Sequence, residues 1–250
     1  RGEVVALLGP NGAGKTSTVE ILEGGRRATE GTVRVLGRDP ATADDRWRSR
    51  IGIVHQESTP PAELTPRELL GFQACLFPAP IDVEEALRLV DLVPQGDQRA
   101  GTLSGGQQRR LDVALGLIGD PELVFLDEPT TGLDPEARRA SWALVRQLTE
   151  RGTTILLTTH YLEEAEVLAD RVAVVVGGRI VASGTPADLG GRGGAEARVT
   201  FRPPVGAGPL PILDGRSEVG DDGMVTVHTD RPTAAIEALD AQRVPRPRCV

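Results

Sequence analysis

Short apolar segments alternate along the chain with stretches whose apolar residues recur at helical spacing. A strand-then-helix order that repeats in this way is typical of an α/β fold, with a mostly parallel sheet covered by helices on both faces. Between residues 60 and 118, prolines separate helical stretches that we expect to form an inserted helical subdomain. The patterns predict strands at 3–8, 51–55, 123–126 and 153–158, and helices at 15–23, 64–77, 83–90, 135–150 and 162–168.

Two further patterns predict strands outside this regular alternation. Residues 32–36 alternate between apolar and polar side chains, which is typical of a half-buried strand. Residues 172–176 and 179–182 flank Gly177-Gly178, a dipeptide that favours a hairpin turn.

The glycine-rich residues 190–194 predict a linker. We therefore expect a main domain of residues 1–190 and a small C-terminal α+β domain of residues 191–250. Within the smaller domain, we expect strands at 197–201 and 224–228, a helix at 233–239 and a disordered Arg- and Pro-rich end at 243–250.

The composition limits the function. A net charge of −8 disfavours a nucleic-acid binder that relies on a basic surface. Cys75 and Cys249 are too few for a disulfide framework and favour a reducing environment. No apolar run reaches the roughly 20 residues that a membrane-spanning helix needs. The first predicted strand already begins near Arg1, so we expect the natural N-terminus to lie upstream.

A glycine-rich loop joins the first predicted strand to the first predicted helix. Residues 9–16 match G-x-x-x-x-G-K-[ST], a phosphate-binding loop in which backbone N–H groups and a helix N-terminus converge on phosphate oxygens. We expect Lys15 to bind the β- and γ-phosphates and Thr16 to bind Mg²⁺. The alternative is a glycine-rich turn that matches the pattern by chance, which we expect in about 0.2% of chains of this length and composition. The predicted nucleotide-binding residues of this loop are Gly9, Pro10, Asn11, Gly12, Ala13, Gly14, Lys15, Thr16 and Ser17.

Lys15 is also the only lysine among the 28 lysines and arginines of the chain. A compact ammonium suits a phosphate loop better than a planar guanidinium does. The alternative is that a strong preference for arginine left one lysine at this position by coincidence.

The apolar segment 123–126 ends in two carboxylates. In a phosphate-loop protein a carboxylate at this place holds Mg²⁺ directly or through water, and we assign that role to Asp127. Glu128 is then placed to orient and activate the attacking water as a general base. A solvated strand end is the better interpretation of an isolated Asp-Glu pair, but the phosphate loop reverses that balance.

Residues 103–107, Leu-Ser-Gly-Gly-Gln, precede a helix with apolar periodicity. Ser104 and Gln107 fit a capping box, while Gly105 and Gly106 open the backbone to an approaching anion. This segment resembles the signature motif of the ABC ATPase family, and the resemblance covers about residues 1–190.

Three single residues follow the order of that family. Gln56 resembles the Q-loop glutamine, Asp134 the D-loop aspartate and His160 the switch histidine. Taken singly, each has a simpler interpretation: a loop glutamine, a helix N-cap before Pro135, and a histidine bonded locally. Their order and spacing favour the functional interpretation.

The resemblance implies a P-loop NTPase fold with ATP and Mg²⁺ as cofactors and a head-to-tail homodimer. ATP would lie between the phosphate loop of one copy and residues 104–107 of the other, with Ser104 and Gly106 at the γ-phosphate. Asp134 would communicate across the dimer, and His160 would bridge the γ-phosphate and the attacking water. Gln56 would contact Mg²⁺ or water and report to a membrane subunit.

Residues 159–166 resemble the ATP subunits of ABC-2 exporters of the daunorubicin-resistance class. This resemblance implies a motor at the cytoplasmic face of the cell membrane, which powers efflux of a drug-like or lipophilic compound through a separate permease. A non-transport ABC ATPase acting on ribosomes or nucleic acid is the alternative, and the acidic composition weighs against it. The aromatic residue that stacks on adenine in this family is missing before Lys15, and we expect it upstream of Arg1.

Overall fold

The computed structural model describes residues 2–56, 60–189, 197–201, 216–220, 224–229 and 248–249. The chain divides into two compact units, Arg1–Pro186 and Ala187–Val250. Among the described residues, the first unit contains a six-stranded sheet and the second a four-stranded sheet.

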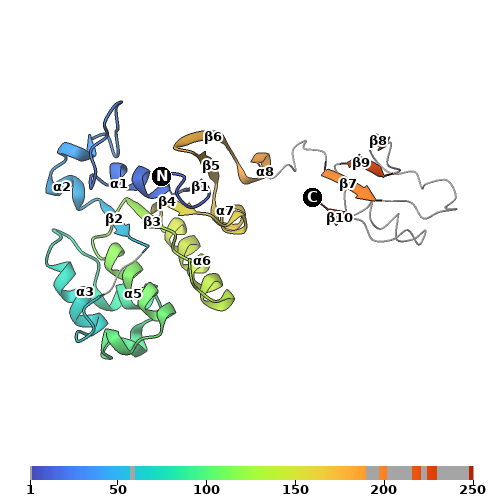
Figure 1. Ribbon diagram of the computed structural model, residues 1–250. Helices are drawn as coiled ribbons and strands as arrows, with labels where there is room; N and C mark the ends of the chain where they lie inside the picture. The colour runs from blue at the N-terminus through green and yellow to red at the C-terminus, as the bar shows by residue number, and fades with distance from the viewer. Residues whose placement is uncertain are drawn as a thin grey trace. The chain divides into compact units, whose positions relative to one another are not determined.

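A mostly parallel sheet forms the centre of the first unit (Figure 1). Its strand order is β2-β3-β4-β1-β5-β6, and each neighbouring pair is parallel except the hairpin of β5 and β6. This confirms the α/β architecture that the alternating pattern predicts. The strands are β1 (Val4–Leu8), β2 (Ile51–Val54), β3 (Leu123–Asp127), β4 (Thr154–Thr159), β5 (Arg171–Val176) and β6 (Arg179–Gly184).

Side chains along β3 alternate between two apolar cores. Val124 and Leu126 pack in one cluster with Leu144, whereas Phe125 packs in the other with Val19 and Trp47. Successive side chains of a strand point to opposite faces, so the sheet is covered on both sides. The helices that carry these contacts and their neighbours are α1 (Lys15–Leu22), α2 (Asp45–Arg48), α6 (Pro135–Glu150) and α7 (Leu162–Leu168).

Three helices that lie between β2 and β3 in sequence pack against one another (Figure 1). Each begins after a residue whose side chain accepts a hydrogen bond from a backbone N–H of the first turn: Thr65, Asp82 and Ser104. The three are α3 (Pro66–Ala74), α4 (Val83–Leu89) and α5 (Gly105–Leu117), and the 3-10 helices η2 (Val93–Gln95) and η3 (Ala100–Thr102) connect α4 to α5.

The carboxyl ends of neighbouring strands meet at one edge of the sheet. Leu8 of β1 pairs with Thr159 of β4, and Asp127 of β3 pairs with Thr158 of β4. Ligands of open α/β sheets bind outside this edge. The loops that follow β1, β3 and β4 therefore lie together although they are far apart in sequence.

The strand predicted at residues 32–36 is wrong. Only Val35 takes part in β-pairing there, through an isolated bridge to Arg38. Leu36 and Gly37 have φ of 49° and 80°, so the chain reverses at once and leaves too few residues for a ladder. The 3-10 helix η1 (Pro40–Thr42) follows.

The second unit contains an antiparallel sheet of order β10-β7-β9-β8. The disorder predicted at 243–250 is wrong for Arg248 and Cys249, which pair with β7. The rest of that segment, the predicted linker at 190–194 and the predicted helix at 233–239 lie outside the described residues. The elements are β7 (Ala197–Phe201), β8 (Arg216–Val219), β9 (Val225–Thr229) and β10 (Arg248–Cys249), and α8 (Pro186–Leu189) spans the boundary of the units. Among the helices of the described residues, none has the length and apolar character needed to span a membrane.

Candidate functional site

The loop between β1 and α1 has a backbone suited to an anion. Gly12 and Gly14 have φ of 77° and 101°, a region that other residues rarely adopt. Gly14 occupies the N-cap position of α1 and brings no side chain over the first N–H groups of that helix. A Cβ on Gly9 would lie 2.3 Å from the carbonyl oxygen of Val175, so the loop also packs closely against β5. The positive end of α1 and its N–H groups can therefore reach a bound phosphate.

A cavity of about 280 Å³ lies over this loop. It brings Gln56, after β2, and Glu128, after β3, to the same place as the loop. A second cavity of about 290 Å³ contains Asp127, and Thr16 lines both. The residues around the first cavity are Asn11, Gly12, Gly14, Lys15, Thr16, Ser17, Gln56 and Glu128.

Lys15 is buried and has three acceptors. Its Nζ donates to the carbonyl oxygens of Gly9 at 2.8 Å and Pro10 at 3.2 Å, and it lies 3.1 Å from Oε1 of Glu128. Beside them, the carbonyl oxygen of the buried Ala13 accepts from the N–H of Gly178 at 2.9 Å. The ammonium is thereby fixed at the cavity wall, next to a carboxylate of opposite charge.

Glu128 has an unusual backbone and a crowded carboxylate. Its φ is 45°, and its N–H donates to Oγ1 of Thr158 at 3.0 Å. Its Oε2 accepts from Oγ1 of Thr131 at 3.1 Å and lies 3.2 Å from Nδ1 of His160. Burial alone raises the pKa of Glu128, but the hydrogen bond and charge of Lys15, followed by Thr131 and His160, outweigh it and lower the pKa overall. Glu128 is therefore ionised at neutral pH and can accept a proton.

Asp127 precedes Glu128 in the chain, and His160 contacts the carboxylate of Glu128. Asp127 is 4% exposed and accepts a hydrogen bond from Oγ1 of Thr158, which fixes its orientation toward the second cavity. The ring of His160 lies against that of Tyr161, with centroids 4.0 Å apart. The structure thus brings together the loop, Gln56, Asp127, Glu128 and His160.

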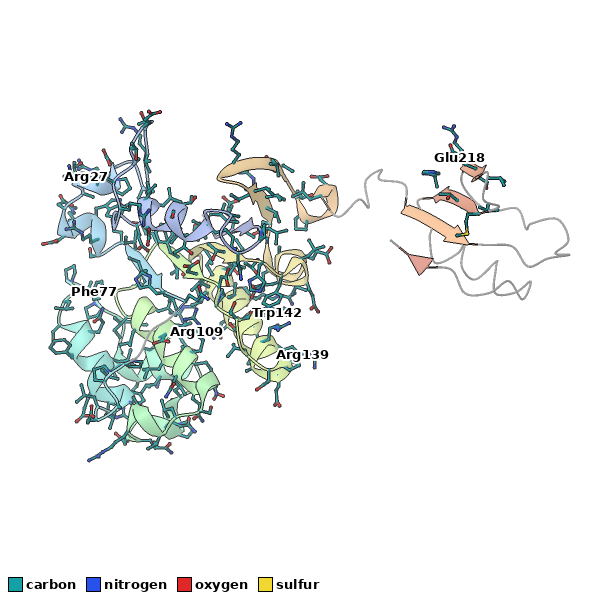
Figure 2. The ribbon with its side chains drawn as sticks, in the orientation of Figure 1. Arg27, Phe77, Arg109, Arg139, Trp142 and Glu218 are labelled. Atoms are coloured by element: carbon teal, nitrogen blue, oxygen red, sulfur yellow. The ribbon has the colours of Figure 1, made fainter. Side chains whose placement is uncertain are left out.

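Arg109 of α5, which is labelled in Figure 2, was not singled out from the sequence. Its guanidinium donates to the carbonyl oxygens of Asp127 and Pro129, each at 3.1 Å, and to that of His55. Burial lowers its pKa, although a guanidinium stays charged. No periodicity or motif marks this position, because its partners are backbone carbonyls distant in sequence.

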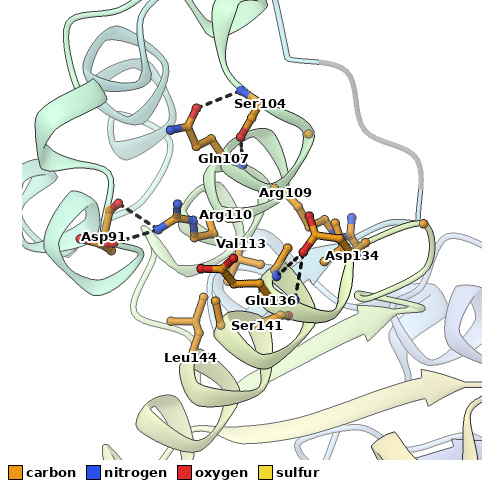
Figure 3. A pocket seen from close by; sticks show the side chains of 16 residues that line it. Asp91, Ser104, Gln107, Arg109, Arg110, Val113, Asp134, Glu136, Ser141 and Leu144 are labelled. Atoms are coloured by element: carbon orange, nitrogen blue, oxygen red, sulfur yellow. Dashed lines mark hydrogen bonds and ion pairs between the residues drawn. The ribbon is translucent and has the colours of Figure 1, made fainter.

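Residues 104–107 begin α5 with the predicted capping box. Oγ of Ser104 accepts from the N–H of Gln107 at 3.3 Å, and Oε1 of Gln107 accepts from the N–H of Ser104 at 2.9 Å. These residues, Gly105 and Gly106 line a cavity of about 530 Å³ between α5 and α6, which also contains Asp134 (Figure 3). The side chain of Asp134 caps α6.

This third cavity shares no lining residue with the cavity over Lys15. In one copy of the chain, Ser104, Gly105, Gly106, Gln107 and Asp134 therefore line a different cavity from the phosphate loop. The cavity lined by residues 104–107 has a volume of about 530 Å³, and the cavity over the phosphate loop one of about 280 Å³.

Comparisons with known proteins agree on one family. A family model described as ABC transporter matches residues 1–131. The daunorubicin/doxorubicin resistance ATP-binding protein DrrA of Streptomyces peucetius is 40% identical over 254 residues, 97% of this chain and 74% of that protein. The Nod factor export ATP-binding protein I of Sinorhizobium fredii is 48% identical over 191 residues, 74% of this chain and 55% of that protein.

Solved structures give the same fold. The protein cbiO1 of Clostridium perfringens, part of the ABC transporter complex cbiONQ, has a TM-score of 0.69 and 28% identity, over 76% of this chain and 79% of that chain. The ATP-binding cassette MJ0796, in a dimeric post-hydrolysis state bound to ADP and Pi, has a TM-score of 0.66 and 26% identity, over 74% of this chain and 86% of that chain.

The chain belongs to the ABC transporter family. It is an ATP-binding and ATP-hydrolysing subunit of the exporter type. Such subunits dimerise and work with membrane permeases. The alignment with DrrA covers 97% of the chain and so extends into the second unit.

Proposed function

We propose that the cavity over residues 9–17 binds the phosphates of ATP and that Glu128 activates the attacking water. The observation that carries this proposal is the pair of Lys15 and Glu128, a buried cation and a buried carboxylate 3.1 Å apart on one cavity wall. Lys15 would bind the β- and γ-phosphates while Glu128 accepts a proton from water. His160, in contact with Glu128, would bridge the γ-phosphate and that water.

Thr16, Asp127 and Gln56 would hold Mg²⁺. This ion takes oxygen ligands, usually one or two from the protein and the others from phosphate and water. The donor set fits, because the Thr16 hydroxyl borders both cavities and Thr158 orients the buried Asp127 carboxylate. When bound, Mg²⁺ would neutralise charge on the phosphates.

Two copies would pack head to tail, so that residues 104–107 of one copy complete the phosphate cavity of the other. The separation of the two cavities within one chain supports this arrangement. Ser104, Gly105, Gly106 and Gln107 present a helix N-terminus, which favours an anion such as the γ-phosphate. Asp134, beside them, would report the state of the site across the dimer.

Sedimentation of the Glu128→Gln variant with Mg-ATP tests the dimer. We expect a dimer with ATP and a monomer with ADP, because the variant retains the γ-phosphate. Ser104→Arg in the same background should remove the dimer, whereas Arg139→Ala, on the exposed surface of α6, should retain it. A monomer in ATP, or a dimer that survives Ser104→Arg, would contradict the proposal.

The complete transporter would export a drug-like or lipophilic compound. The support is the similarity to proteins named for resistance to daunorubicin and for Nod factor export. The chain would bind a permease at the cytoplasmic face of the membrane and would not bind nucleic acid. Residues 1–190 would form the ATPase domain and residues 191–250 an accessory domain. ATP-dependent uptake of daunorubicin is the expected result in inverted vesicles that contain this chain and its permease. Binding to ribosomes without such uptake would favour a non-transport ATPase.

A further inference from the structure

A fully buried carboxylate lies outside the cavities described above. Glu164 in α7 is 0% exposed. Its Oε1 accepts from Oγ1 of Thr130 at 2.9 Å and from Nε1 of Trp142 at 3.1 Å, and Trp142 of α6 is labelled in Figure 2. Its Oε2 has no hydrogen-bond partner among the described residues. An apolar side chain would fill this space without the cost of burying a carboxylate. The distinctive contributions of Glu164 are therefore the two hydrogen bonds that it accepts and its charge interaction with the buried Arg109.

One of these two bonds leads to Glu128. Thr130 is 1% exposed and lies in the turn that follows Glu128. The N–H of Thr131 donates to the carbonyl oxygen of Glu128 at 3.2 Å, and Oγ1 of Thr131 donates to Oε2 of the same residue at 3.1 Å. Because Glu164 holds Thr130, it also sets the position of the next residue, Thr131. Thr131 binds both the backbone and the carboxylate of Glu128.

The turn needs such support. Glu128 has a φ of 45°, which is strained for a residue with a side chain, and Pro129 restricts it further. A strained backbone persists only where the surroundings hold it. Here Thr158 binds the N–H of Glu128, Arg109 binds the carbonyl oxygen of Pro129 and Glu164 binds the side chain of Thr130.

We propose that Glu164 is a positioning residue for ATP hydrolysis, which acts through Thr130 and the 128–131 turn to aim the carboxylate of Glu128 at water. This inference rests on the proposed role of Glu128 as the base. The bond from Trp142 to the same oxygen joins α6 to α7 and leads away from the turn.

The two donors to Oε1 provide a matched test in the full chain. Thr130→Val removes the bond that leads to Glu128, and Trp142→Phe removes the bond that does not. We expect Thr130→Val to lower kcat about tenfold or more with little change in the KM for ATP, since small misplacements of a catalytic group cost up to about a hundredfold. Trp142→Phe should keep kcat within about twofold of the wild type, even if it lowers the midpoint of thermal unfolding as much as Thr130→Val does.

Conservative changes separate positioning from stability. Thr130→Ser keeps a hydroxyl and Glu164→Gln keeps an acceptor oxygen, so both should retain most of kcat, whereas Glu164→Leu should lose it. In a Trp47→Phe background Trp142 is the only tryptophan, and its emission maximum should be unchanged by Thr130→Val and shifted by Glu164→Leu.

The outcomes distinguish the inference from the function on which it rests. Wild-type kcat in Thr130→Val, or equal losses of kcat in Thr130→Val and Trp142→Phe, would overturn the positioning role. Wild-type kcat in Glu128→Gln would instead overturn the proposed base, whatever the variants of Thr130 show.

Discussion

The substitution Glu128→Gln separates two contributions of one carboxylate. The amide keeps the size of the side chain and one acceptor oxygen, but it removes the negative charge 3.1 Å from Nζ of Lys15 and the ability to take a proton. General-base catalysis contributes about 10²–10⁴-fold, so we expect kcat to fall at least about a hundredfold. Mg-ATP should still bind, because the phosphate loop is unchanged.

The same substitution should destabilise the protein without nucleotide. The side chains of Lys15 and Glu128 are 4% and 8% exposed, so water screens their interaction little. A hydrogen bond to a charged group contributes about 1.5–3 kcal/mol, and glutamine keeps part of it, so the free energy of unfolding should fall by about 1–2 kcal/mol. In saturating Mg-ATP the phosphates become partners of Lys15, and this loss should largely disappear.

Phosphate release at saturating Mg-ATP measures the first effect, and urea unfolding with and without nucleotide measures the second. Glu163→Gln makes the same chemical change on the exposed face of α7 and should alter neither quantity. A kcat for Glu128→Gln within about twofold of the wild type, or a stability loss that is the same with and without ATP, would refute the reasoning.

Three further predictions follow from the geometry. The pKa of Glu128 in the folded chain lies below its ordinary value of 4.5, so its carboxylate stabilises the fold above that pH, and this contribution is lost as the pH falls below it. Urea unfolding across pH should therefore show a smaller loss of stability in acid for Glu128→Gln than for the wild type. Gly9→Ala places a Cβ 2.3 Å from the carbonyl oxygen of Val175, so calorimetry should show ATP binding weakened about tenfold or more. Arg109→Leu removes the donor to the part-buried carbonyl groups of Asp127 and Pro129, so urea unfolding should show a loss of about 3 kcal/mol in the free energy of unfolding. A loss below about 0.5 kcal/mol would contradict these two bonds.

The regular α/β pattern was predictable because its signals are local. Apolar segments of 123–126 and 153–158 became β3 and β4, and Pro135 begins α6 as its position after Asp134 predicts. The strand predicted at residues 32–36 is wrong because alternation indicates a half-buried surface and does not show whether a partner strand is available. The segment Arg216–Val219 is polar and carries no apolar alternation, so its sequence does not predict the strand β8 that it forms.

The candidate site was predictable where a motif concentrates its residues, as in the loop that contains Lys15. The contacts between motifs were not, since they depend on how the sheet aligns its strand ends. Nothing in the sequence indicates that Glu128 adopts a φ of 45°, that Arg109 binds the carbonyl oxygen of Pro129, or that Glu164 holds Thr130. These are tertiary hydrogen bonds between residues that are distant along the chain.

The most direct test of the nucleotide site is the affinity of the chain for Mg-ATP before and after Lys15→Ala, measured by titration calorimetry. Lys15 is the only lysine, is buried at the cavity wall and supplies the charge expected to bind the β- and γ-phosphates. We predict that the wild-type chain binds Mg-ATP and that Lys15→Ala weakens binding by at least about tenfold. Equal affinity of the two proteins would show that the cavity over this loop is not where the nucleotide binds.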